Sequence, residues 1–249
     1  MKRFIIALQF LTIIRLSKSI NISSEELGKS MKYFPMVGLF LGFVLAFSNT
    51  LLNYILPGPV VDGILLIILI ILTGALHLDG FVDTVDGLAG GNTKEEILRI
   101  MRDSNTGAIG AVGLTALLLL KYVSLMHIPD EMKNQVLVAM PVISRYSMVQ
   151  VSFFLKYART GSGLGSPFTS HVGKTEFLTA LIITLLLSSV LLNIKGVVLI
   201  GMVSTCTLGL IAVYKKKLGG TTGDSFGATN EVNEVLVLIF LLVSIHSMY

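Results

Sequence analysis

The chain has 249 residues, of which 53% are hydrophobic and 14% are charged, and its mean hydropathy is +0.81. This composition excludes a soluble globular protein, because 19 basic and 15 acidic residues cannot cover so large an apolar core. The net charge of +4 is not gathered into the aromatic-interleaved basic patch that nucleic-acid binding requires, so we expect no nucleic-acid partner. Cys206 is the only cysteine, which excludes an internal disulfide and a thiolate metal cluster.

Seven apolar windows reach or nearly reach the length that crosses a hydrocarbon core of about 30 Å. The N-terminal stretch "MKRFIIALQFLTIIRL" is too short to cross, and we expect it at the interface or re-entering the membrane. We therefore predict an all-α polytopic helical bundle in a lipid bilayer, with about seven spans (six to eight) and amphipathic interfacial segments. Residues 1–249 would form one membrane-embedded catalytic domain. The windows are 36–56, 60–78, 107–128, 135–156, 176–192, 196–214 and 235–248.

The segments that connect these windows fall alternately on two sides of the membrane. One side holds fourteen Lys and Arg residues and the other holds two. By the positive-inside rule the basic side is cytoplasmic, so we expect a cytoplasmic (inner) membrane protein whose active site faces the cytoplasm. The basic side comprises 1–34, 79–106, 157–175 and 215–234, and the other comprises 57–59, 129–134 and 193–195.

An acidic motif, "HLDGFVDTVDG", follows the second window at residues 77–87. On a helix Asp79, Asp83 and Asp86 occupy positions i, i+4 and i+7 and share one face. Mg²⁺ prefers a few carboxylate oxygens together with water and substrate phosphates, and it would relieve the repulsion between these acids. We therefore predict that the three aspartates are metal ligands and catalytic residues. A solvated acidic helix is the alternative, and His77 is either a catalytic base or phosphate contact or a packed residue.

The next segment, "TKEEILRIMRDSNTGAIG" at 93–110, predicts an amphipathic interfacial helix. Arg99 and Arg102 are predicted substrate-binding residues. Asp103 and Ser104 are also substrate-binding candidates, with Asp103 a weaker fourth metal ligand, unless they only end this helix or cap the next. Three glycines follow at three-residue spacing and allow a ligand or another helix to approach closely: Gly107, Gly110 and Gly113.

The third polar segment, "KKKLGGTTGDSFGATNEVNE" at 215–234, is predicted to be a loop beside three lysines. Its glycines would let backbone N–H groups turn toward phosphate oxygens, as in anion-binding nests. The lysines alone are also explained by topology. The predicted substrate-binding residues of this segment are Gly220, Thr222, Gly223, Asp224 and Glu231.

Two cations, Lys121 and Arg145, lie inside predicted spans. Such residues face a bundle interior, pair with an acid or line a polar cavity. The guanidinium of Arg145 could grip a pyrophosphate at two points, so Arg145 is a predicted substrate-binding residue. Lys121 either shares this role or extends toward the interface.

Several motifs together resemble the cobalamin synthase family, the adenosylcobinamide-GDP ribazoletransferases. The resemblance implies a Mg²⁺-dependent membrane enzyme that joins adenosylcobinamide-GDP to α-ribazole or its 5′-phosphate. GMP would be released and adenosylcobalamin or its 5′-phosphate formed, and a homo-oligomer or a complex with other cobamide-assembly enzymes is left open. The motifs, in order, are "ALQFLT" at 7–12, "YFPMVGLFLG" at 33–42, "HLDGFVDTVDG" at 77–87, "RIMRDSNTGAIG" at 99–110 and "GGTTGDSFGATNEVNE" at 219–234.

In the expected reaction an oxygen of ribazole attacks the phosphorus attached to cobinamide, and metal ions held by carboxylates stabilise the charge on the departing GMP. The base is one of the aspartates, His77 or Glu231. Rival readings are a CDP-alcohol phosphotransferase, whose DGxxAR start is missing, and a membrane prenyltransferase, whose second aspartate motif is missing. A cation-coupled transporter would place acids inside the spans and carry an internal repeat.

Overall fold

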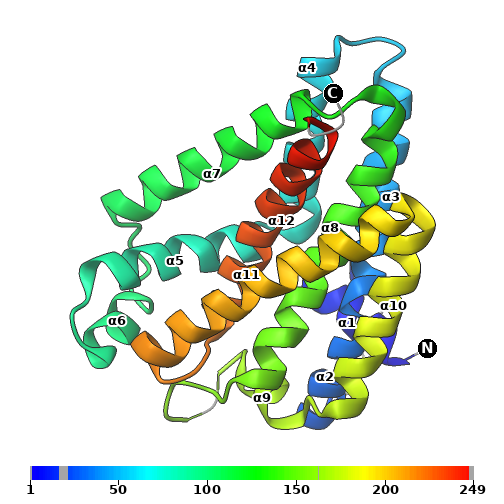
Figure 1. The fold of residues 1–249 in the computed structure, drawn as a ribbon. Helices are drawn as coiled ribbons and strands as arrows, with labels where there is room; N and C mark the ends of the chain where they lie inside the picture. Colours follow the sequence, from blue (N-terminus) through cyan, green and yellow to red (C-terminus); the bar gives the residue numbers. More distant parts are fainter. Residues whose placement is uncertain (1, 17–21, 162, 247–249) are drawn as a thin grey trace.

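The computed structural model describes residues 2–16, 22–161 and 163–246 (Figure 1). Over these residues the chain is helical throughout, apart from its connections and one isolated bridge between Tyr157 and Thr221. The helices are α1 (Lys2–Leu11), α2 (Ser24–Ser30), α3 (Phe34–Leu52), α4 (Gly58–Thr73), α5 (Leu76–Gly90), α6 (Lys94–Ile100), α7 (Ala108–Met126), α8 (Asp130–Phe154), α9 (Ser166–His171), α10 (Lys174–Leu192), α11 (Ile194–Leu218) and α12 (Gly223–His246), with a 3₁₀ turn at Met31–Tyr33.

Six helical stretches of the described chain are long and apolar enough to cross a membrane, or seven if the bent pair α4–α5 is counted as one span. The prediction of a polytopic all-α bundle is therefore confirmed. The six are Ser24–Leu52, α7, α8, α10, α11 and α12.

Two predicted boundaries are wrong. The window 60–78 does not continue as one helix, because Gly74 and Ala75 both adopt left-handed backbone angles (φ 59° and 57°) and turn α5 by 90° from α4. The last helix begins at Gly223 instead of 235, so the predicted loop 215–234 shrinks to four residues. The rest of the predicted window 235–248 beyond His246 lies outside the described residues.

Helix α8 forms the centre of the bundle and packs against α3, α10, α11 and α12. Its closest neighbour is α3, where Gly38 faces Pro141 and Gly42 faces Val138. A Cβ atom at Gly38 would come within 2.2 Å of the Pro141 carbonyl oxygen. The missing side chains thus let two helix backbones touch, which is how helices pack where lipid supplies no hydrophobic drive.

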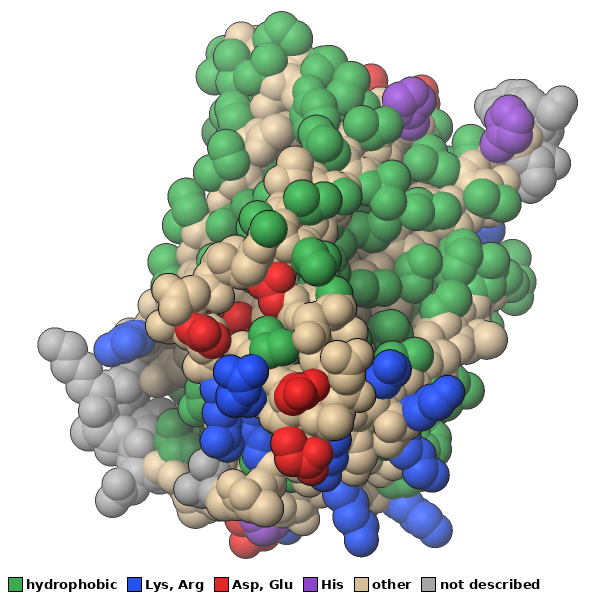
Figure 2. All heavy atoms as spheres, turned by 90° about the vertical axis from the view of Figure 1, so that its left-hand side faces the viewer, with side chains coloured by type: hydrophobic (Ala, Val, Ile, Leu, Met, Phe, Trp, Pro, Cys, Tyr) green, Lys and Arg blue, Asp and Glu red, His purple; other side chains and the backbone are tan. Residues whose placement is uncertain are grey.

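Most of the charged side chains on the face drawn in Figure 2 lie toward one end of the molecule. Figure 2 shows Lys, Arg, Asp and Glu side chains gathered on the lower half of the face formed by the left-hand side of Figure 1, whereas hydrophobic side chains cover the upper half. Large apolar side chains such as Phe47 and Val190 stand 69% and 83% exposed on the outer helices. This exposure fits contact with lipid.

Helices α5 and α12 meet near this charged end, and glycines form the contact. A Cβ atom at Gly80 would lie 2.7 Å from the Asp224 carbonyl oxygen, and one at Gly227 would lie 2.9 Å from the His77 carbonyl oxygen. The two backbones therefore touch at the start of α12. This contact sets Asp79 and Asp83, which flank Gly80 on α5, beside Asp224.

Candidate active site

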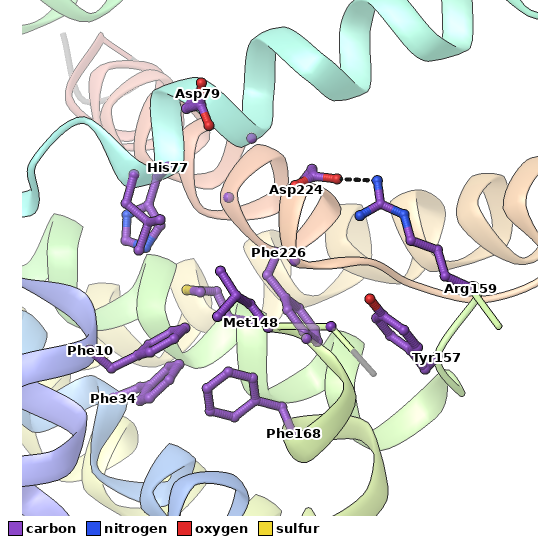
Figure 3. A pocket seen from close by; sticks show the side chains of 17 residues that line it. Phe10, Phe34, His77, Asp79, Met148, Tyr157, Arg159, Phe168, Asp224 and Phe226 are labelled. Atoms are coloured by element: carbon purple, nitrogen blue, oxygen red, sulfur yellow. Dashed lines mark hydrogen bonds and ion pairs between the residues drawn. The ribbon is translucent and has the colours of Figure 1, made fainter. Parts of the chain in front are cut away.

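A cavity of 180 Å³ lies where α5 and α12 meet, beside α1, α3, α8 and α9 (Figure 3). One wall is apolar and aromatic, and the other carries two carboxylates and a guanidinium. The aromatic wall consists of Phe10, Phe34, Phe168 and Phe226, and the charged wall of Asp79, Asp224 and Arg159.

The charged wall is built across two helices and a loop. Arg159 Nη2 donates a hydrogen bond of 2.7 Å to Asp224 Oδ2, and Asp79 is exposed one turn before Asp83 on α5. Asp83 is half-buried and experiences the like charges of Asp79, Asp224 and Asp86, with Arg159 as the opposing charge. Four carboxylates thus lie near one cation, which favours binding of a further cation there.

Asp86, predicted to be the third metal ligand, has another partner. Its Oδ2 accepts the backbone N–H of Gly107 at 2.8 Å, and its Oδ1 accepts that of Gly110 at 2.7 Å. The carboxylate therefore caps the first turn of α7, where N–H groups have no partner inside the helix. Gly107 and Gly110 are needed because a Cβ atom at either would collide with this carboxylate at 2.4 Å or less.

The glycines of this motif serve helix contacts. The Asp224 backbone occupies the space beside Gly80, and a Cβ atom at Gly87 would lie 2.5 Å from the Met101 side chain. The sequence left open whether Gly107 and Gly110 allow a ligand or another helix to approach. In the structure it is helix α5, through Asp86, that lies against both glycines.

Within the described parts of the chain, no three His, Cys, Asp or Glu side chains converge where they alone could hold a metal ion. The structure thus does not bring Asp79, Asp83 and Asp86 together as one ligand set. Mg²⁺, however, is commonly held by one or two carboxylates, water and the phosphates of a substrate. Asp79 with Asp83 or Asp224 matches that donor set, so the residues fit a metal that binds together with its substrate.

His77 lines the same cavity and is only 2% exposed. Neither ring nitrogen has a hydrogen-bond partner in the structure. Buried polar atoms are nearly always paired, so an unpaired ring at a cavity wall is available to bond to a ligand there. The sequence left open whether His77 takes part in the chemistry or is a packed residue. The structure is compatible with both, because the ring lines the cavity and the backbone packs against Gly227.

A second, basic pocket of 380 Å³ opens beside the first. Arg99 of α6 and Arg102, just after the end of α6, line it, as predicted for one site, together with Lys94. Arg159 belongs to both pockets, so it forms the partition between the acidic wall and the basic pocket. The arrangement places several cations next to a region that attracts a metal ion, a pattern suited to a diphosphate.

Asp103 and Ser104 lie exposed in the loop after α6 and line neither pocket. Asp103 Oδ1 accepts the backbone N–H of Asn105 at 3.0 Å and its side-chain amide at 2.7 Å. These bonds hold the pKa of Asp103 below its ordinary value. Asp103 therefore ends the α6 segment, and the cap of α7 comes from Asp86.

Two amides of the loop between α11 and α12 bond within the protein. The N–H of Thr221 donates to the Lys156 carbonyl, and the N–H of Thr222 donates to Ser225 Oγ. Ser225 N–H donates back to Thr222 Oγ1, so the pair caps α12 and starts the helix early. Gly220 is buried against Lys156, whereas Gly223 and Asp224 line the cavity.

Arg145 and Glu231 are buried in the bundle interior and do not line the cavity. Lys121 bonds to Glu231 at 2.5 Å and to Glu234 at 2.6 Å, and Arg145 pairs with Glu234. All four side chains are buried. The expectation that cations inside the spans pair with acids is confirmed. Their partners, Glu231 and Glu234, lie on helix α12, whereas the sequence predicted them to lie in a loop. The predictions of a phosphate contact for Arg145 and a base at Glu231 receive no support from this placement.

Sequence reasoning missed Arg159 and the aromatic wall. In the sequence, Arg159 contributed only to the prediction of membrane orientation, and it belongs to no recognisable motif. The phenylalanines come from α1, α3, α9 and α12, so their meeting depends on the tertiary fold.

Comparison with known proteins identifies the family. Residues 3–242 match the family described as cobalamin-5-phosphate synthase. The chain belongs to the cobalamin-5-phosphate synthase family. An adenosylcobinamide-GDP ribazoletransferase of Geotalea daltonii is 41% identical over 242 residues, which cover 97% of each chain. A protein of the same name from Syntrophobacter fumaroxidans is 36% identical and covers 93% of this chain and 94% of its own.

A third relative with that name, from Caldanaerobacter subterraneus, is 34% identical over 98% of each chain. No solved structure matches this chain. The cobalamin-5-phosphate synthase match includes both pockets, since all residues named in their walls lie between 3 and 242. It favours the resemblance found in the sequence over the rival transferase and transporter readings.

Proposed function

We propose that this protein transfers α-ribazole or α-ribazole 5′-phosphate onto adenosylcobinamide-GDP and releases GMP. The observation that carries the proposal is the position of Arg159 between the acidic cavity wall and the basic pocket. A diphosphate that spans this partition has carboxylates and a metal on one side and cations on the other. The names of the family relatives supply the identity of the donor substrate.

The proposed cofactor is Mg²⁺, which Asp79 and Asp83 would hold together with substrate oxygens, since Asp224 is already paired with Arg159. It would supply charge neutralisation at the reacting phosphate. The remaining chemistry falls to the chain. Arg159 and Arg99 orient the diphosphate, and the basic pocket stabilises the negative charge that develops on GMP.

The proposed step is a single displacement at phosphorus. A hydroxyl oxygen of ribazole forms a bond to the phosphorus attached to cobinamide, while the bond from that phosphorus to the bridging oxygen breaks. GMP leaves with the electron pair. The hydroxyl proton passes to a carboxylate oxygen of Asp224, which lines the same cavity as Asp79.

We further propose that the charged end faces the cytoplasm and that the protein lies in the inner membrane. The excess of Lys and Arg in the segments at this end supports that orientation. A water-soluble nucleotide-activated corrinoid would then reach both pockets from the compartment in which it is made.

The test is turnover by the purified protein in lipid nanodiscs. It is incubated with adenosylcobinamide-GDP, α-ribazole and Mg²⁺, and corrinoid product and GMP are quantified by mass spectrometry. We expect equal amounts of the two products. Absence of both from well-folded protein would refute the proposed function.

A further inference from the structure

We propose that the aromatic wall of the 180 Å³ cavity binds the flat base of the acceptor nucleoside, α-ribazole. The inference rests on the proposed function and assigns one part of one substrate to one part of the site. It names Phe10, Phe168 and His77 as specificity-determining residues.

The size of the cavity selects its occupant. A cavity of about 150 Å³ lined by apolar side chains holds a benzene molecule, and pockets for whole drug-sized ligands run to about 300–1,000 Å³. At 180 Å³ the space fits a bicyclic aromatic ring and is far too small for a corrinoid macrocycle. Among the proposed substrates, the ribazole base, guanine and the adenine of the adenosyl group are flat rings of this size.

The chemistry of the wall separates the ribazole base from the two purines. Phe168 stands at its centre, with ring centroids 4.9 Å from Phe10, 5.6 Å from Phe34 and 6.1 Å from Phe226. Guanine and adenine each carry several donors and acceptors that such a wall would leave unpaired, which is costly in a buried site. A benzimidazole is apolar except for one ring nitrogen that accepts a hydrogen bond. The wall therefore favours the benzimidazole.

His77 supplies a partner for that nitrogen. Its ring is buried, both nitrogens are unpaired, and Figure 3 shows it at the cavity beside Phe10. A neutral imidazole donates from one nitrogen, so it can bond to the acceptor nitrogen of the base. A hydrogen bond from His77 to the ring nitrogen of the base would therefore satisfy both groups.

The placement also agrees with the reaction. The carboxylates of Asp79 and Asp224 line the same cavity as the phenylalanines. A base held against Phe168 therefore projects its ribose toward the acidic wall, where the attacking hydroxyl is needed. The basic pocket beyond Arg159 is left for the GDP portion of the other substrate.

The test uses Phe10→Leu, since Phe10 is only half-buried, with Phe153→Leu as the matched control. Phe153 stacks on Phe177 at 4.6 Å and does not line the cavity. Loss of aromatic stacking should raise the KM for α-ribazole about 3- to 10-fold in Phe10→Leu. The KM for adenosylcobinamide-GDP should stay unchanged, and Phe153→Leu should change neither.

A second measurement uses the unmodified protein and avoids any folding defect. Binding of radiolabelled α-ribazole, without the second substrate, is competed with other ribosides. Benzimidazole riboside should compete at least about 10-fold better than guanosine, and better than an indole riboside that lacks the acceptor nitrogen. His77→Ala should abolish only the preference over the indole riboside.

Each outcome has a distinct meaning. Equal competition by guanosine, or an unchanged α-ribazole KM in an active Phe10→Leu protein, would overturn the inference while the proposed function stands. A rise in the KM for adenosylcobinamide-GDP instead would assign the cavity to that substrate and overturn the inference. Lack of turnover by the unmodified protein would refute the proposed function, and specific ribazole binding would still be measurable.

Discussion

Glu234→Gln should destabilise the protein strongly, because Glu234 balances two buried cations. Its side chain is fully buried and pairs with Lys121 and Arg145, whereas Glu231 pairs with Lys121 alone. The four groups carry two positive and two negative charges. Glutamine keeps the shape of the side chain but leaves an uncompensated positive charge in the bundle.

Breaking one side of a buried ion pair costs about 3–5 kcal/mol. For a chain of this size, 1 kcal/mol lowers the melting midpoint by about 2–4 °C, so a fall of about 10 °C is expected. The double variant Arg145→Met/Glu234→Gln removes one charge of each sign and leaves the Lys121–Glu231 pair. It should regain most of the lost stability, since the buried charge is again balanced.

The midpoint is measured by heating nanodisc protein and following helix content by circular dichroism. Glu26→Gln is the matched control, because Glu26 forms an exposed pair with Lys2 and exposed pairs contribute little. A midpoint for Glu234→Gln within 2 °C of the unmodified protein, or a double variant no more stable than the single one, would refute the reasoning.

Three further predictions concern the site and its orientation. Asp86→Asn leaves one acceptor oxygen for two α7 amides and should cost about 1–2 kcal/mol of stability, measured as a lower melting midpoint; an unchanged midpoint would contradict the capping contact. Gly80→Val places a side chain within 2.7 Å of the Asp224 backbone and should separate α5 from α12, lowering turnover at least about 10-fold; normal turnover would show that this contact does not set the site. In a Cys206→Ser background, cysteines at Asn92 and Asp130 should react with a membrane-impermeant thiol reagent from opposite sides; labelling from one side would contradict the topology.

The length of the apolar windows predicted most of the spans, since a membrane span is a local property of the sequence. The spacing of Asp79 and Asp83 likewise placed both on one helix beside the cavity. The pairing of Arg145 with an acid also followed from the cost of an intramembrane charge. Its partner, Glu234, was predicted to lie in a loop, because the residues before Val235 are mostly polar. The cap formed by Thr222 and Ser225 instead starts α12 at Gly223.

What the sequence could not give depends on contacts between distant segments. Asp86 looks identical to Asp83 in the motif, and only the approach of α7, more than twenty residues later, turns it into a helix cap. Arg159 follows the end of α8 without a motif, yet it separates the two pockets. The aromatic wall is likewise invisible to any periodicity, because it joins single residues from separate helices.

The central claim is that the carboxylates beside Gly80 bind a metal ion needed for ribazole transfer. The most direct measurement is the rate of GMP release in nanodiscs by Asp83→Asn, with Glu26→Gln as a control that makes the same charge change on an exposed surface. We predict a loss of at least about 1,000-fold for Asp83→Asn with an unchanged melting midpoint, and loss of activity of the unmodified protein in EDTA that Mg²⁺ restores. Near-normal GMP release by Asp83→Asn, or full activity in EDTA, would contradict the account.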